Sequence, residues 1–266
     1  MIGRASLAAA ARAVLSEPDA NEKAARSVST AALWRSGDLA LSNEPIAMPE
    51  RPARPARPEL LAPRDMPRRR IGGTAGRIAL LHAVAHIELN AIDLAWDLIG
   101  RFTSESWPKE FYADWISVAA DEAHHFTLLA GRLNDLGAHY GDLPAHDSLW
   151  QAAMSTAHDP LARLAVVPMV LEARGLDVTP GMIARLRRVG DDTSADILDI
   201  IYREEISHVA AGARWFGFLC RKRGLPETET WRGLVSKYHG GTLKPPFNEA
   251  ARRESGMAPE LYASLG

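Results

Sequence analysis

Residues 111–129 read FYADWISVAADEAHHFTLL, and two polar residues interrupt an otherwise apolar helical stripe within them. The apolar residues recur at steps of three and four, which is typical of one buried face of an α-helix. Glu122 and His125 lie on that same face, one helical turn apart. His124 falls about 100° away from it. The stretch therefore predicts a core helix that turns Glu122 and His125, and not His124, toward the interior.

Similar stripes recur along the chain. Helices are expected at about 75–103, 109–137 and 193–223. A further helix opens near Pro160, and GLDVTPG at 175–181 is expected to kink, bulge or interrupt it before it resumes at 182–189. Each stripe carries ionisable residues, which are Glu88 on the first helix, Glu122 and His125 on the second, Glu172 on the third, and Glu205 and His208 on the fourth. These residues predict an all-α protein with a polar centre in its core.

Buried carboxylates need compensating charge, because an unpaired one costs several kcal/mol. Two divalent ions would balance four glutamates, and two neutral imidazoles could complete the ligand set. The spacing supports this interpretation, since Glu88 precedes Glu122 by 34 residues and Glu172 precedes Glu205 by 33. In two antiparallel hairpins, the paired residues would reach the same height along their helices. The sequence thus predicts a dinuclear metal site with six protein ligands.

This ligand set, two single glutamates and two Glu-x-x-His pairs, resembles that of the ferritin-like di-iron carboxylate proteins over about residues 75–223. Several segments resemble more narrowly the DUF455 family of ferritin-like proteins, namely HIELNAIDLAWD, FYADWISVAADEAHHFTLL, YGDLPAHDSLW, EARGLDVTP and REEISHVAAGARWF. The resemblance implies a ferritin-like four-helix bundle that binds two iron ions, with manganese as an alternative. It also suggests an O2-dependent hydroxylase, because the related enzyme of known chemistry is a tRNA hydroxylase acting on isopentenyl-type modified adenosine.

Roles can be assigned to individual residues within this site. Glu122 and Glu205 are the bridging candidates, with Glu88 and Glu172 terminal. Asp121 and Glu204, which immediately precede the bridging glutamates, are expected to support the opposite histidine, although a solvated surface acid is the alternative. His86 is expected to be a hydrogen-bonding neighbour, not a ligand. Tyr202 could be a redox-active or substrate-contacting phenol, but a packed tyrosine is favoured.

Two other classes of function stay open. The alternative to a di-iron oxygenase is a non-catalytic ferritin-like protein for iron storage or peroxide protection. A binding module is a third, because the arginine- and proline-rich segment RPARPARPELLAPRDMPRRR at 51–70 could touch RNA, although such arms usually lie along their own domain. An enzyme would need a small-molecule or modified-nucleoside substrate and a separate electron-donor protein. A homodimer is also considered.

The whole chain has 266 residues and is divided into an N-terminal helical prelude and Pro/Arg arm (1–71), the bundle (72–224) and a C-terminal helical tail (225–266) that packs on the bundle. Its 31 basic and 33 acidic residues create no global attraction to nucleic acid or membrane. The single cysteine, Cys220, excludes an internal disulfide. No apolar run long enough to span a membrane occurs. We expect a cytoplasmic location, and prefer an ordinary Ala/Arg-rich helix over an organelle transit peptide for MIGRASLAAAARAVLSE at the N-terminus.

Overall fold

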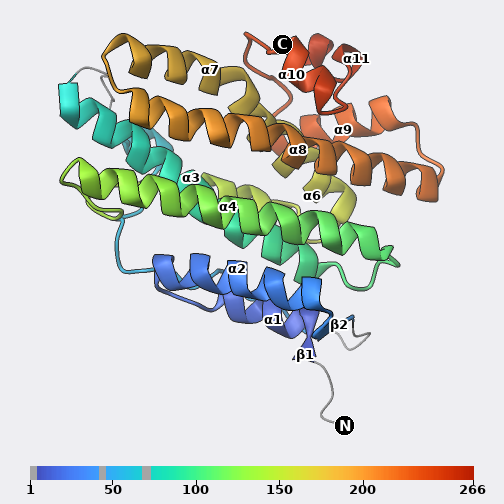
Figure 1. The fold of residues 1–266 in the computed structure, drawn as a ribbon. Coiled ribbons are helices and arrows are strands. Elements are labelled where there is room, and N and C mark those ends of the chain that lie inside the picture. The colour runs from blue at the N-terminus through green and yellow to red at the C-terminus, as the bar shows by residue number, and fades with distance from the viewer. Residues whose placement is uncertain (1–4, 42–45, 68–72) are drawn as a thin grey trace. The chain divides into compact units, whose positions relative to one another are not determined.

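The predicted all-α class is confirmed by a computed structural model, which describes residues 5–41, 46–67 and 73–266 (Figure 1). The arginine run 68–70 and the expected domain boundary at 71/72 lie outside the described residues. The chain forms two compact units, Met1–Trp150 and Gln151–Gly266. Each unit is built around one long helical hairpin.

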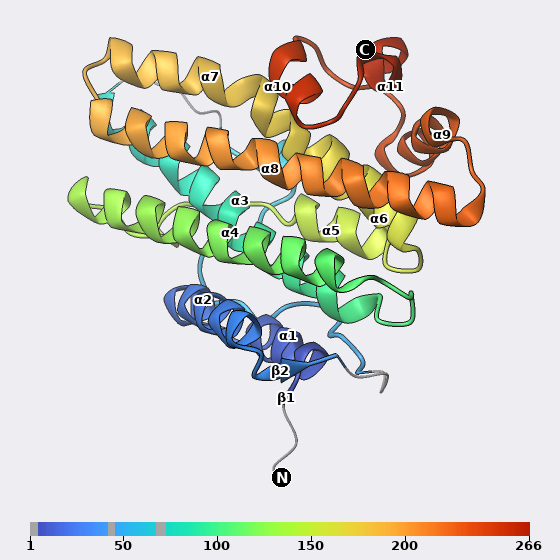
Figure 2. The same ribbon diagram turned by 45° about the vertical axis from the view of Figure 1, so that its right-hand side comes forward.

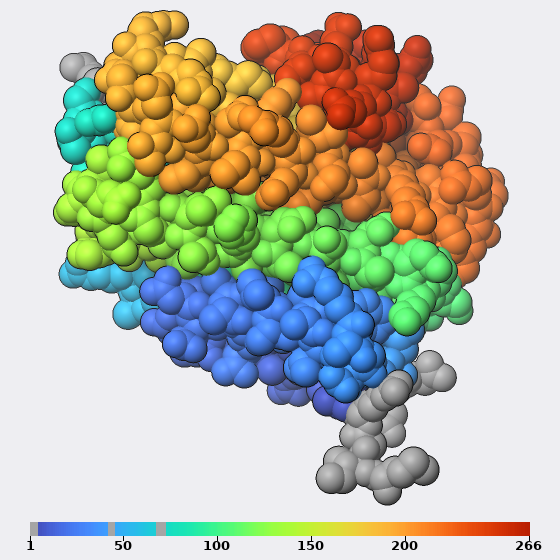
Figure 3. Space-filling view, viewed as in Figure 1, coloured from blue at the N-terminus to red at the C-terminus, as the bar shows by residue number. Residues whose placement is uncertain are grey.

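The hairpin of the first unit consists of α3 (Gly73–Arg101) and α4 (Lys109–Asp135), both within about two residues of the expected bounds. Two N-terminal helices cover it, α1 (Leu7–Leu15) against α3 and α2 (Ala20–Ser36) against α4. The surfaces of α2 and α4 meet along the face shown in Figure 3. The short strands β1 (Ala5–Ser6) and β2 (Leu39–Ala40) pair in parallel at the ends of the α1–α2 hairpin.

The residues between α2 and α3 include an extended strap, which we define as residues 46–62, followed by a turn of 3-10 helix, Pro63–Asp65. Backbone hydrogen bonds fix the strap near its middle, from Ala53 N to Leu15 O at 2.8 Å, and near its C-terminal end, from Leu61 N to Ala145 O at 2.8 Å. Gly100 on α3 allows the strap to approach, because an added Cβ there would lie 2.5 Å from the sulfur of Met48. The proline-rich arm thus lies along its own unit.

The second unit is built on α7 (Ala173–Arg188) and α8 (Asp192–Arg223), which lie side by side in Figures 1 and 2. The remaining helical elements of this unit are α6 (Pro160–Val166), a π-helix (Val167–Glu172), α9 (Glu227–His239), α10 (Glu249–Glu254), α11 (Pro259–Tyr262) and a final 3-10 turn (Ala263–Leu265). Helix α5 (Ser148–Ser155) contains the boundary between the units.

GLDVTPG does not interrupt the helix, although an interruption was one of the expected outcomes, since α7 continues through this segment with Pro180 inside it. The irregularity lies upstream, where Pro168 has no N–H for the carbonyl of Leu164 and the helix widens to a π-helix that ends at Glu172. Gly212 on α8 faces this widened segment, and a Cβ there would lie 2.5 Å from Cβ of Pro168. The absence of a side chain at Gly212 therefore lets α8 approach the π-helix closely.

Helix α3 is the one helix, among the residues that the structure describes, long and apolar enough to span a membrane. However, 78% of its most apolar window is buried inside the protein. Its apolar character is explained by its position as the core helix of the first unit, packed between α1 and α4.

Candidate metal centre

The hairpin of the first unit brings three predicted ligands together. Glu88 projects from α3, and Glu122 and His125 project from successive turns of α4. They are 3%, 0% and 0% exposed, respectively. His125 Nδ1 lies 3.0 Å from Glu88 Oε2 and 3.5 Å from Glu122 Oε2. One ligand atom from each residue can be chosen so that all lie within 4.8 Å of one another, and this buried cluster could hold a metal ion.

The donor geometry fits a divalent cation. Two ligand atoms that each lie about 2.1 Å from an ion, at right angles, are separated by about 3.0 Å. This is close to the separations between His125 Nδ1 and the two carboxylates. Two carboxylates and a neutral imidazole carry two negative charges, which one divalent cation would balance. Nδ1 of His125 faces both carboxylates and is therefore the nitrogen suited to a shared ion.

Protons stabilise this cluster when metal is absent. Burial, and then the charge of Glu122, raise the pKa of Glu88 to about 8. Burial lowers the pKa of His125, but the hydrogen bonds and charges of Glu122 and Glu88 outweigh it and raise the pKa to about 12. Both pKa values lie above the ordinary ones, so these protons stabilise the folded protein at low pH. Their stabilisation is lost as the pH rises, and for Glu88 the loss occurs as the pH passes its pKa of about 8.

We therefore expect metal binding to strengthen steeply with pH, because an ion must displace the protons of Glu88 and His125. Between about pH 6 and pH 8 the affinity should rise more than tenfold per pH unit, since more than one proton is released. Competition of Co(II) between the protein and a coloured chelator would measure this. Glu88→Gln should lower the slope of the logarithm of the affinity against pH by about one, since one proton fewer is released. The exposed His124→Ala should leave this slope unchanged. An affinity independent of pH would contradict the assignment of the cluster.

The hairpin of the second unit carries the other three predicted ligands. Glu172 ends the π-helix and is half-buried, while Glu205 and His208 lie one turn apart on α8 and are 9% and 0% exposed. His208 Nδ1 lies 3.8 Å from Glu205 Oε2. The two units thus repeat the same motif, a single glutamate beside a Glu-x-x-His pair, although the single glutamate of the second unit stands on an irregular helix.

The remaining residues singled out in the sequence differ in their burial and contacts. His124 is exposed, and Asp121 and Glu204 are half-buried. His86 Nδ1 lies 2.8 Å from the Tyr140 hydroxyl and Nε2 lies 3.1 Å from the carbonyl of His146. Both nitrogens of His86 are thus engaged with the loop after α4, and burial, then the charge of Arg54, lower its pKa to about 3. His86 is a neutral hydrogen-bonding residue in this position, two residues from Glu88.

Comparison with known proteins gives the family of the chain. A family model described as "Protein of unknown function (DUF455)" matches residues 16–263. The chain belongs to the DUF455 family. An uncharacterized protein of Haemophilus influenzae is 43% identical over 208 residues, which cover 76% of this chain and 72% of the relative. No solved structure matches the sequence. The family match extends from before α2 to α11, so the strap and the C-terminal segment of this DUF455 protein fall within it as well as the two hairpins.

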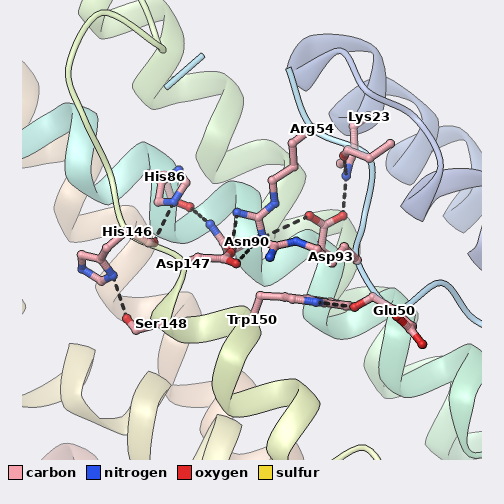
Figure 4. Close-up of polar contacts among 12 residues, drawn as sticks. Lys23, Glu50, Arg54, His86, Asn90, Asp93, His146, Asp147, Ser148 and Trp150 are labelled. Carbon is pink, nitrogen blue, oxygen red and sulfur yellow. Dashed lines mark hydrogen bonds and ion pairs between the residues drawn. The ribbon is translucent and has the colours of Figure 1, made fainter. Parts of the chain in front are cut away.

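A second buried polar cluster in this DUF455 protein was missed from the sequence (Figure 4). It joins the strap to α2 and α3 through Lys23, Arg54, Asn90, Asp93 and Asp147. Lys23 Nζ lies 2.5 Å from Asp93 Oδ1 and donates to the carbonyl of Ala53 at 2.8 Å. Arg54 Nη1 lies 3.1 Å from Asp147 Oδ1, and Arg54 also donates to Asn90. Charges from four separate segments, α2, the strap, α3 and the loop before α5, thus neutralise one another beside α3, which also carries Glu88.

The sequence of α3 contains a pattern of polar residues that indicates this cluster. His86, Asn90, Asp93 and Asp97 recur at steps of four, three and four, which places them on a second, polar stripe of that helix. The partners could not be found in the same way, because Lys23 and Arg54 are 70 and 39 residues away from Asp93 along the chain. Arg51 and Arg54, which could have served an RNA-binding arm, both form ion pairs with Asp147.

Proposed function

We propose that this DUF455 protein is a ferritin-like di-iron protein that catalyses an O2-dependent oxidation, with hydroxylation as the expected reaction. The observation that supports this proposal most strongly is the buried cluster of Glu88, Glu122 and His125, whose donors suit iron or manganese. Carboxylate and imidazole ligands without cysteine are the set used by di-iron carboxylate proteins. A reducing cytoplasmic location would keep such iron in the divalent state.

The dinuclear centre would combine the two repeated motifs. Glu88, Glu122 and His125 would hold one ion, and Glu172, Glu205 and His208 the other, with Glu122 and Glu205 as bridges. Four carboxylates would balance two divalent ions, which explains why each hairpin buries acidic residues in its core. Asp121 and Glu204 would orient the imidazoles, and His86 would fix the turn of α3 that precedes Glu88.

The bound metal would supply activation of O2 and oxidation of the substrate. The surrounding residues would exclude water and hold α3 and α4 in register. The substrate would be a small molecule or a modified nucleoside, and a separate protein would supply electrons. Tyr202 is a candidate for contact with this substrate, although its hydroxyl accepts a hydrogen bond from Asn248 at 2.9 Å.

The competing function, iron storage or peroxide protection, is distinguished by the reaction of the iron-loaded protein with O2. For an oxygenase, we expect uptake of Fe(II) to stop at about two ions per chain, and O2 consumption to continue only while a reductant is supplied. An O2 electrode together with iron analysis after gel filtration would measure both. Continued iron uptake far beyond this ratio, with formation of a mineral core, would instead show storage.

A further inference from the structure

The segment of α7 that follows Glu172 is held by the C-terminal part of the second unit. Arg174 Nη1 donates to the carbonyl of Lys244 at 2.6 Å. Asp177 accepts from Asn248 N at 2.9 Å. Both contacts fall within five residues of Glu172, directly after the π-helix. The first turn of α7, which determines where Glu172 is placed, is therefore tied to residues more than 65 positions away.

A buried ion pair fixes this contact. Arg252 donates to both oxygens of Asp177, from Nε at 2.9 Å and from Nη2 at 2.7 Å. Their side chains are 3% and 0% exposed. The guanidinium also lies over the rings of Phe247 and Tyr262, at 4.9 and 4.7 Å from the ring centroids. A bidentate pair of this kind holds its partners in one orientation, and its loss would leave a buried charge uncompensated.

Asn248 connects α7, which begins directly after Glu172, to α8, which carries Glu205. Its Nδ2 donates to the carbonyl of Leu176 at 3.1 Å and to the hydroxyl of Tyr202 at 2.9 Å. In a regular helix the Leu176 carbonyl would accept from residue 180, but that residue is Pro180 and has no N–H. Asn248 thus supplies the hydrogen bond that Pro180 cannot, and this explains how α7 continues through the proline. Tyr202 lies one turn before Glu205 on α8.

We propose that residues 243–265 position Glu172 and Glu205 for metal binding, and that Asn248 is the central positioning residue. The inference rests on the proposed dinuclear site. Glu172 stands at the end of a π-helical segment, a rare geometry that is frequent at functional sites. Asn248 and Arg252 hold the helix that follows it from outside, through their hydrogen bonds to Leu176 and Asp177. The ion held by the second unit would therefore depend on the C-terminal segment more strongly than the ion held by the first unit, which this segment would affect only through the bridging Glu205.

The test is a titration of metal-free, full-length protein with Co(II), followed by its visible absorption and by competition with a chelator. The variant Asn248→Ser keeps a good N-cap for α10, where the Asn248 side chain accepts from Ala251 N, but removes the amide that reaches Leu176 and Tyr202. We expect the ion held by the second unit to lose about tenfold to 100-fold in affinity, with an altered spectrum, while the ion held by the first unit loses clearly less. Tyr202→Phe, which removes only the contact to α8, should show a smaller loss.

The control variant is Leu186→Ala, a fully buried position near the far end of α7 that does not contact the C-terminal segment through any described hydrogen bond. It should lower the midpoint of unfolding without changing the ratio of the two affinities. Equal affinities in Asn248→Ser and the wild type, or an equal change in Leu186→Ala, would overturn the positioning role. Wild-type protein that binds no Co(II) would instead overturn the proposed function on which the role rests.

Discussion

Replacing Lys23 with methionine should destabilise the protein by about 3–5 kcal/mol, because it removes one partner of a buried ion pair. Lys23 and Asp93 are each about 1% exposed at their side chains, and Lys23 Nζ lies 2.5 Å from Asp93 Oδ1. Methionine fills a similar volume but leaves the carboxylate of Asp93 opposed by Arg54 alone, whose nearest nitrogen is 4.0 Å away. Chemical denaturation followed by circular dichroism would measure the loss.

The pH dependence of this loss provides an internal check. Burial raises the pKa of Asp93, whereas the charge of Lys23 lowers it. Without Lys23 the folded protein should bind a proton at Asp93 more readily, so the loss of stability should be smaller at about pH 5 than at about pH 8. The double variant with Lys23→Met and Asp93→Leu should recover much of the stability. A loss below about 1 kcal/mol, equal at both pH values, would show that the pair is not essential to the fold.

The same cluster explains the position of the strap. The strap carries Arg54 into the cluster, and the carbonyl of Ala53 accepts from Lys23 at 2.8 Å. Deleting the N-terminal 70 residues would therefore remove both cations that face Asp93, in addition to α1 and α2. Arg51 and Arg54 of the strap form ion pairs within the first unit, which favours the intramolecular interpretation of the arm over RNA binding.

The long helices could be predicted from the sequence because their information is local. Stripes at steps of three and four located α3, α4 and α8, and the same stripes selected Glu88, Glu122 and His125, which the structure brings together. The adjacent histidines of DEAHHF were separated by helical geometry alone, since the structure buries His125 and exposes His124.

The irregular parts of the fold could not be predicted because they depend on distant residues. GLDVTPG contains two glycines and a proline and looked like a break, but Asn248 provides a hydrogen bond to Leu176 O and the helix continues. Pro168 sits in an apolar run and gave no sign of the π-helix, which requires Gly212 on α8 to make room. The partners of Asp93 and Asp177 were likewise hidden, since ion pairs between residues 70 and 75 positions apart leave no periodic signal.

The central claim, a metal centre built on Glu122, is tested most directly by elemental analysis of purified protein after anaerobic loading with Fe(II) and removal of unbound iron. The wild type should retain about two iron ions per chain, and Glu122→Ala should lose both, because this glutamate is the proposed bridge. His124→Ala, one helical position from His125 and exposed, should retain the wild-type amount. Wild-type protein without bound iron or manganese, or a Glu122→Ala variant that retains the full amount, would contradict the proposed metal centre.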